Sequence, residues 1–114
     1  MTAVRLFAAV VLALLNAYAQ DTRTVTEPVI PPSCTVLAAQ LSAPLKDADE
    51  KKPDTRRIQD ALDHCPAGRA VELKAGAFLA GPFQLRAGVT LLMDRDAVLF
   101  ASRNPRDYDV EPGS

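Results

Sequence analysis

The most constraining feature of this chain is the close spacing of short apolar segments between Val71 and Ala101. Segments with strand composition begin near residues 71, 78, 83, 89 and 98, and Gly, Pro or Asp residues close them. Parallel strands joined by helices need a dozen or more connecting residues, so this spacing excludes an α/β parallel sheet. It suits a β-solenoid, whose stacked coils bury apolar rows, or a small antiparallel barrel. Periodicity alone leaves both architectures open.

A short amphipathic helix is predicted just before these segments, over residues 55–64. One apolar stripe follows the helical spacing i, i+3, i+4, i+7 and consists of Ile58, Ala61, Leu62 and Cys65. Asp54 is the candidate N-cap, and Pro66 with Gly68 ends the helix.

The region before the helix divides into three parts. Residues 20–32 are polar and rich in proline, which predicts an extended arm because proline removes amide donors. Val36, Leu37, Gln40 and Leu41 have a spacing that permits one or two helical turns, which Pro44 would stop. Residues 46–53 carry mixed charges without apolar support, which predicts a solvated loop.

Several short motifs resemble one known family. They are Asp54-Thr55, Ile58-Gln59, Ala61-Leu62, residues 75–82 (AGAFLAGP), Val89-Thr90-Leu91 and Asp107-Tyr108. They look like the N-terminal region of family 28 glycoside hydrolases, the polygalacturonase-like enzymes. The resemblance covers about half of the chain, over the start of the fold and its first coils.

This resemblance favours the solenoid over the barrel. The expected fold is all-β with a capping helix: the first coils of a right-handed parallel β-helix, incomplete in this chain. In the family such a helix covers the N-terminal end of the β-helix, so the apolar stripe would shield the first coil and its strand edge.

The resemblance also places the family's chemistry elsewhere. Its catalytic aspartates lie in later Asn-Thr-Asp, Asp-Asp, Gly-His-Gly and Arg-Ile-Lys motifs, and none of these occurs here. Arg57-Ile58-Gln59 differs from the last of them in its third residue. No catalytic, cofactor-binding or metal-binding residue is therefore predicted, and no cofactor is expected.

The N-terminus predicts a secretory signal peptide over residues 1–19. Arg5 precedes an apolar run from residue 6 to 15, and Ala17-Tyr18-Ala19 is a small-x-small site, so cleavage is expected between Ala19 and Gln20. A membrane anchor is the alternative, but Arg5 and Asp21 enclose 15 uncharged residues, fewer than the roughly 20 that a spanning helix needs. The expected location is secreted or periplasmic, with no membrane association after cleavage.

The domain scheme is then a signal peptide (1–19), an extended arm with a charged linker (20–53), and the capping helix with the first coils (54–114).

The two cysteines, Cys34 and Cys65, are expected to form a disulfide, because an even count in an exported chain favours one. The bond would tie the N-terminal arm to the end of the helix. Two unpaired thiols, or bonds to other partners, are the alternatives.

The remaining polar groups have structural rather than catalytic interpretations. Glycosidases need two carboxyl groups flanking one bond, whereas the carboxylate pairs here lie in turns or a charged linker: Asp47 with Asp49, Asp94 with Asp96, and Asp107 with Asp109. His64, the one histidine, stands at the helix end, where it can complement the helix dipole or face solvent.

Composition narrows the partners. The chain has 13 basic and 14 acidic residues, which is not the strongly basic balance of a nucleic-acid-binding protein. Tryptophan is absent, which argues against a dedicated carbohydrate-binding module.

The expected function is an N-terminal fragment of a secreted polygalacturonase-like hydrolase, inactive alone, whose full-length relatives would act on a pectin-like polysaccharide. The alternative is a stand-alone, secreted, non-catalytic β-rich binding protein. Sugar specificity, endo or exo action and oligomeric state do not follow from the sequence.

Overall fold

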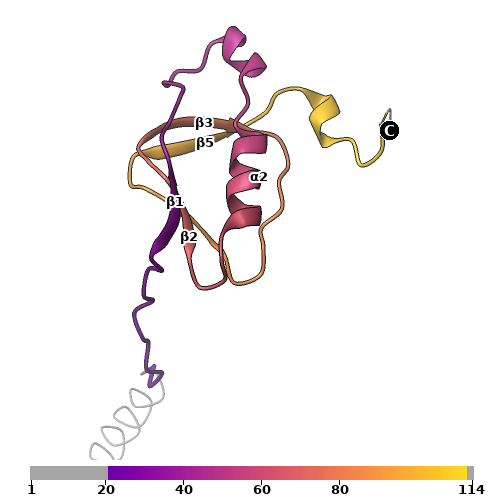
Figure 1. The fold of residues 1–114 in the computed structure, drawn as a ribbon. Helices are drawn as coiled ribbons and strands as arrows, with labels where there is room; N and C mark the ends of the chain where they lie inside the picture. Colours follow the sequence, from indigo (N-terminus) through magenta and orange to yellow (C-terminus); the bar gives the residue numbers. More distant parts are fainter. Residues whose placement is uncertain (1–20, 113–114) are drawn as a thin grey trace, which may run out of the picture.

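The computed structural model describes residues 21–112. Five strands, one α-helix and two 3-10 helices follow one another in this order: β1 (Ser33–Leu37), η1 (Asp47–Lys51), α2 (Thr55–His64), β2 (Ala70–Leu73), β3 (Gly76–Ala80), β4 (Thr90–Met93), β5 (Ala97–Ala101) and η2 (Pro105–Tyr108). The residues before β1 run away from this body as an extended arm (Figure 1). Within the described part, no helix has the length and apolarity to cross a membrane.

The strands form two short parallel sheets, ordered β1-β2-β4 and β3-β5. Figure 1 shows the β3–β5 sheet crossing one end of the sheet that contains β1 and β2. The register pairs Ala70 with Thr90 and Gly76 with Ala97, so one coil lies above the other at an offset of 20 residues that becomes 21 in the second sheet. Parallel strands stacked at a nearly constant sequence offset are the defining pattern of a β-solenoid, and the predicted fold class is confirmed.

The turns of the two coils repeat as well. Gly68 and Gly88 both adopt left-handed backbone angles, with φ of 84° and 73°. The Gly68 amide donates to the Gly88 carbonyl at 2.7 Å, which joins the two turns. Glycine fits both positions because it has no Cβ to oppose a positive φ.

The core forms where α2 lies against the inside of the coil. Its centre consists of fully buried side chains from the helix and from both sheets: Ile58, Leu62, Val71, Leu73 and Phe78. The predicted helix bounds and apolar stripe are therefore confirmed. The strand edge of the first coil is covered differently from the expectation, because β1 rather than the helix pairs with β2.

Two other local predictions are wrong, and a third, the solvent-exposed charged linker, is incomplete. Residues 33–37 form the strand β1, whereas helical turns were expected around Val36 and Leu37. The strand is favoured because its backbone groups pair with the edge of β2, while a short isolated helix would leave several backbone groups without partners. Residues 83–85 form no strand: the Gln84 amide and carbonyl bond the Gln59 side chain at 2.7 and 3.1 Å. The charged linker contains the 3-10 helix η1. The Arg103 guanidinium lies 2.9 Å from the carboxylate of Asp47 and 2.9 Å from that of Glu50, both of which belong to η1.

The disulfide predicted between Cys34 and Cys65 is present. It joins β1 to the residue after α2, across 31 positions of sequence, and Cys65 is buried in the core. The bond thus attaches the first strand to the helix that covers the coil.

Candidate functional site

The first carboxylate pair, Asp47 and Asp49, lies on η1. Asp47 is bound by Arg103, and the Asp49 carboxylate accepts the Lys46 amide at 2.8 Å. Both groups serve the local fold of the linker and its contact with Arg103.

The second pair, Asp94 and Asp96, lies in the turn between β4 and β5. The Asp94 carboxylate is 3.4 Å from the Lys74 ammonium, while the Asp96 backbone carbonyl accepts the Gly76 amide at 3.1 Å. Lys74 also lies 3.1 Å from Glu72, so Asp94 belongs to a ladder of polar side chains across the sheet.

Glu72 is the centre of this ladder. It accepts a hydrogen bond from the Ser33 hydroxyl at 2.8 Å as well as the one from Lys74. These contacts favour the charged carboxylate, and the hydrogen bond from Ser33 followed by that from Lys74 lowers the pKa of Glu72. The ladder links β1, β2 and the turn after β4, which is a structural role.

The third pair, Asp107 and Asp109, lies in and after η2. Asp107 accepts the Ser102 hydroxyl and the Asn104 side chain, and Asp109 lies 3.4 Å from the Arg106 guanidinium. These contacts hold the 3-10 turn against the end of β5.

His64 is exposed at the end of α2. Its Nδ1 lies 2.7 Å from the carbonyl of Asp60, one helical turn earlier. Among residues 21–112, no group of three or more His, Cys, Asp or Glu side chains is placed to hold a metal ion. The contact with the Asp60 carbonyl places the imidazole against the last turn of α2.

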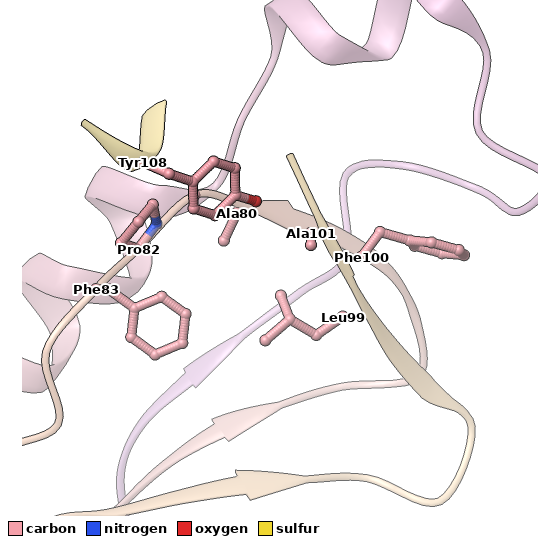
Figure 2. Close-up of a pocket in the computed structure, with 8 residues that line it drawn as sticks. Ala80, Pro82, Phe83, Leu99, Phe100, Ala101 and Tyr108 are labelled. Atoms are coloured by element: carbon pink, nitrogen blue, oxygen red, sulfur yellow. The ribbon is translucent and has the colours of Figure 1, made fainter. Parts of the chain in front are cut away.

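A hollow of about 470 Å³ lies between β5, η2 and the end of β3 with the residues that follow it. Its walls are apolar apart from the Tyr108 hydroxyl, and consist of Ala80, Gly81, Pro82, Phe83, Leu99, Phe100, Ala101 and Tyr108. Figure 2 shows Phe83 and Leu99 on one side of β5 and the Phe100 ring on the other. The Tyr108 hydroxyl is engaged, because it donates to the Ser102 carbonyl at 2.7 Å.

The apolar lining of this hollow would accommodate a hydrocarbon group better than a negatively charged sugar acid. Its lining contains no cationic side chain that could pair with a carboxylate. Leu99 and Phe83 are half-buried and lie against the main core. The hollow is therefore a continuation of the core that opens at the surface.

Sequence reasoning assigned Asp54 the wrong partner. The residue stands at the N-cap position, but its side chain makes no capping hydrogen bond. Its carboxylate accepts the Leu79 amide at 2.9 Å and the Arg57 guanidinium at 2.7 Å. The residue that precedes the helix thus closes the outer edge of β3, which the local pattern could not reveal because Leu79 is 25 positions away.

Comparison with known proteins gives a consistent assignment. No protein-family model matches the chain. An endo-polygalacturonase of Pectobacterium carotovorum subsp. carotovorum is 42% identical over 102 residues, which are 87% of this chain and 23% of that protein. A polygalacturonase of Ralstonia solanacearum is 43% identical over 101 residues, 75% of this chain and 19% of that protein. The solved structure of a polygalacturonase from Erwinia carotovora ssp. carotovora superposes with a TM-score of 0.65 at 41% identity, over 83% of this chain and 23% of that one. The chain thus spans about a fifth to a quarter of the length of the relatives that it matches.

Proposed function

We propose that this chain, which is homologous to one part of the family 28 polygalacturonases, supplies the capped N-terminal coils of a hydrolase that acts on polygalacturonate. The observation that carries this proposal is sequence identity of 42% over 87% of the chain, joined to the same solenoid architecture. The relatives are named for their action on polygalacturonate, and we extend that substrate to the whole protein of which these coils would be a part.

In this proposal the chain contributes architecture rather than chemistry. Inverting glycosidases need an acid and a base about 6.5–9.5 Å apart on either side of the scissile bond. Each carboxylate pair weighed above is instead engaged in a turn, a ladder or a linker. The alternative of a stand-alone binding protein is not favoured, since the matched relatives carry the names of enzymes.

We further propose that the protein is exported, to the cell exterior or the periplasm. Residues 1–19 would form the signal peptide, with cleavage between Ala19 and Gln20, which lie outside the described residues. The disulfide supports this location, since such bonds persist in oxidising compartments. The division into arm and linker (20–53) and helix with coils (54–114) belongs to the same proposal, with β1 contributed by the arm. The mass of the exported protein tests the cleavage site.

The decisive experiment is a reducing-end assay on polygalacturonate. Purified residues 20–114 should release no reducing ends at any pH, because the required carboxyl groups are missing rather than wrongly protonated. The intact Pectobacterium carotovorum endo-polygalacturonase serves as the positive control. Hydrolysis that disappears when Asp94, Asp96, Asp107 or Asp109 is replaced would contradict the proposal.

A further inference from the structure

Residues 21–30 leave the body as an arm in which every residue is exposed (Figure 1). Val25 is 87% exposed and Val29 is 90% exposed. Within residues 21–112, the backbone amides of residues 24–27 donate to no backbone carbonyl, and these residues belong to no helix or strand. The arm therefore carries backbone groups that the folded body does not use.

The composition of the arm between residues 22 and 27 favours a strand. Thr22, Thr24, Val25 and Thr26 are all β-branched, and β-branched residues are enriched in strands. Pro28 ends this segment, because proline has no amide to donate to a ladder. An exposed segment of this kind is a template for pairing with another strand.

The order of the side chains in this segment is symmetric about Val25. Thr24 and Thr26 stand one residue before and after it, and Arg23 and Glu27 stand two residues before and after it. In an antiparallel pair of two copies with a two-fold axis at Val25, Arg23 of each copy lies opposite Glu27 of the other. Thr24 likewise lies opposite Thr26. Threonine pairs and opposite charges at directly opposed positions stabilise antiparallel strands.

Charge selects this register over its neighbours. An axis at Thr24 would place Asp21 opposite Glu27, which are like charges, and an axis at Thr26 would place Glu27 opposite Val25. Parallel pairing in register would place each charge opposite its own copy. Because strand side chains alternate between faces, Arg23, Val25 and Glu27 also share one face of the pair.

The contacts of the arm within one copy leave this pairing possible. The Arg23 guanidinium lies 2.8 Å from the Asp21 carboxylate, with both side chains more than half exposed, and exposed ion pairs of this kind contribute little. Residues 28–32 include three prolines and separate the segment from β1. At about 3.1 Å per residue in an extended proline-rich linker, they hold the body roughly 19 Å from Glu27. The bodies of two copies would thus lie at opposite ends of the paired segment.

We propose that residues 22–27 form an interaction surface for a second copy of this chain, paired as an antiparallel two-stranded ribbon centred on Val25. Such an interface is isologous, since the same residues serve on both copies. A ribbon of two short strands is marginally stable by itself, so the expected dissociation constant is about 0.1–1 mM. The inference goes beyond the proposed hydrolase and does not depend on it.

Charge reversal tests the register. Sedimentation equilibrium of the exported protein, from about 10 µM to 1 mM, measures the dissociation constant. Arg23→Glu and Glu27→Arg should each raise it by about tenfold or more, because each opposes like charges at two positions. An equal mixture of these two variants should associate as the native protein does, since every opposed pair then carries opposite charges. Both residues are exposed in the arm, so the unfolding midpoint of each variant should stay within about 2 °C of the native value.

Arg56→Glu is the matched control, because it makes the same change of charge at an exposed position on α2. It should leave the dissociation constant unchanged. Association that is lost in each variant alone and regained in their mixture supports the proposal. A native protein that stays monomeric throughout, association that persists in Arg23→Glu, or a mixture that stays monomeric overturns it. Hydrolysis of polygalacturonate is not part of this readout, so failure of the proposed function is seen separately.

Discussion

Asp54 and Leu79 are bonded twice although 25 residues separate them. The Asp54 carboxylate accepts the Leu79 amide at 2.9 Å, and the Asp54 amide donates to the Leu79 carbonyl at 2.6 Å. One residue thus replaces a neighbouring strand at the outer edge of β3. The same carboxylate binds Arg57, whose guanidinium lies 5.5 Å from the centre of the Phe78 ring. The start of the helix and the second sheet are therefore fixed to each other.

We predict that Asp54→Ala lowers the free energy of unfolding by about 3 kcal/mol, because it leaves the Leu79 amide and the Arg57 guanidinium without their buried acceptor. Asp54 is 2% exposed. Urea unfolding followed by circular dichroism measures the effect. Asp60→Ala on the exposed face of the same helix is the control, and should change stability by less than about 0.5 kcal/mol. Equal midpoints for the two variants would contradict the role given to Asp54.

Leu62→Asp should prevent stable folding, because it places an unpaired charge in the core at a fully buried position. The expected loss is about 4 kcal/mol or more. Arg56→Ala, which changes an exposed residue of the same helix, should be nearly neutral. Similar unfolding curves for these two variants would show that α2 does not dock on the coil.

The disulfide should contribute about 3–4 kcal/mol by restricting the unfolded chain, since its cysteines are 31 residues apart. Cys34→Ser combined with Cys65→Ser should unfold at correspondingly lower urea concentration. Adding a reductant should move the midpoint of the native protein toward that of the double variant and leave the double variant unchanged. Intact mass after alkylation without reductant checks the bond itself, and two alkylated thiols in freshly exported protein would exclude it.

Gly76→Ala should be more damaging than Gly68→Ala. Both glycines have positive φ, but a Cβ on Gly76 would lie 2.4 Å from the Ala39 Cβ, whereas one on Gly68 would meet nothing within 4 Å. Backbone strain alone should cost about 1–2 kcal/mol at Gly68, and overpacking adds roughly 1–3 kcal/mol at Gly76. Thermal unfolding of the two variants in parallel measures the difference. Equal losses would mean that the approach of Ala39 carries no penalty.

Acid should weaken the fold partly through Glu72. The hydrogen bonds from Ser33 and Lys74 lower the pKa of Glu72 in the folded state. A depressed folded pKa gives stability that is present above the unfolded value of about 4.3 and is lost as pH falls through the folded value. Glu72→Gln should therefore flatten the fall of the unfolding midpoint below about pH 5. Glu27→Gln, in the exposed arm, is the control and should leave the pH profile unchanged.

The sequence by itself determined those features whose causes are local. The apolar stripe of α2 needs only the helical period, so Ile58 and Leu62 identified the helix and its buried face. Four of the five expected strands were found because short apolar segments between turn residues have few other conformations. Motif resemblance then selected the solenoid over the barrel, a choice that periodicity had left open.

Only the tertiary structure decided which backbone edges are paired. Residues 33–37 became a strand because β2 offered them an edge, and residues 83–85 did not because the Gln59 side chain took the hydrogen bonds of Gln84. The partner of Asp54 and the hollow beside Leu99 depend in the same way on residues brought together by the coil. A hydrogen bond or an apolar contact between residues far apart in sequence depends on how the whole chain folds. The local sequence pattern around each residue does not determine which distant residue it will contact.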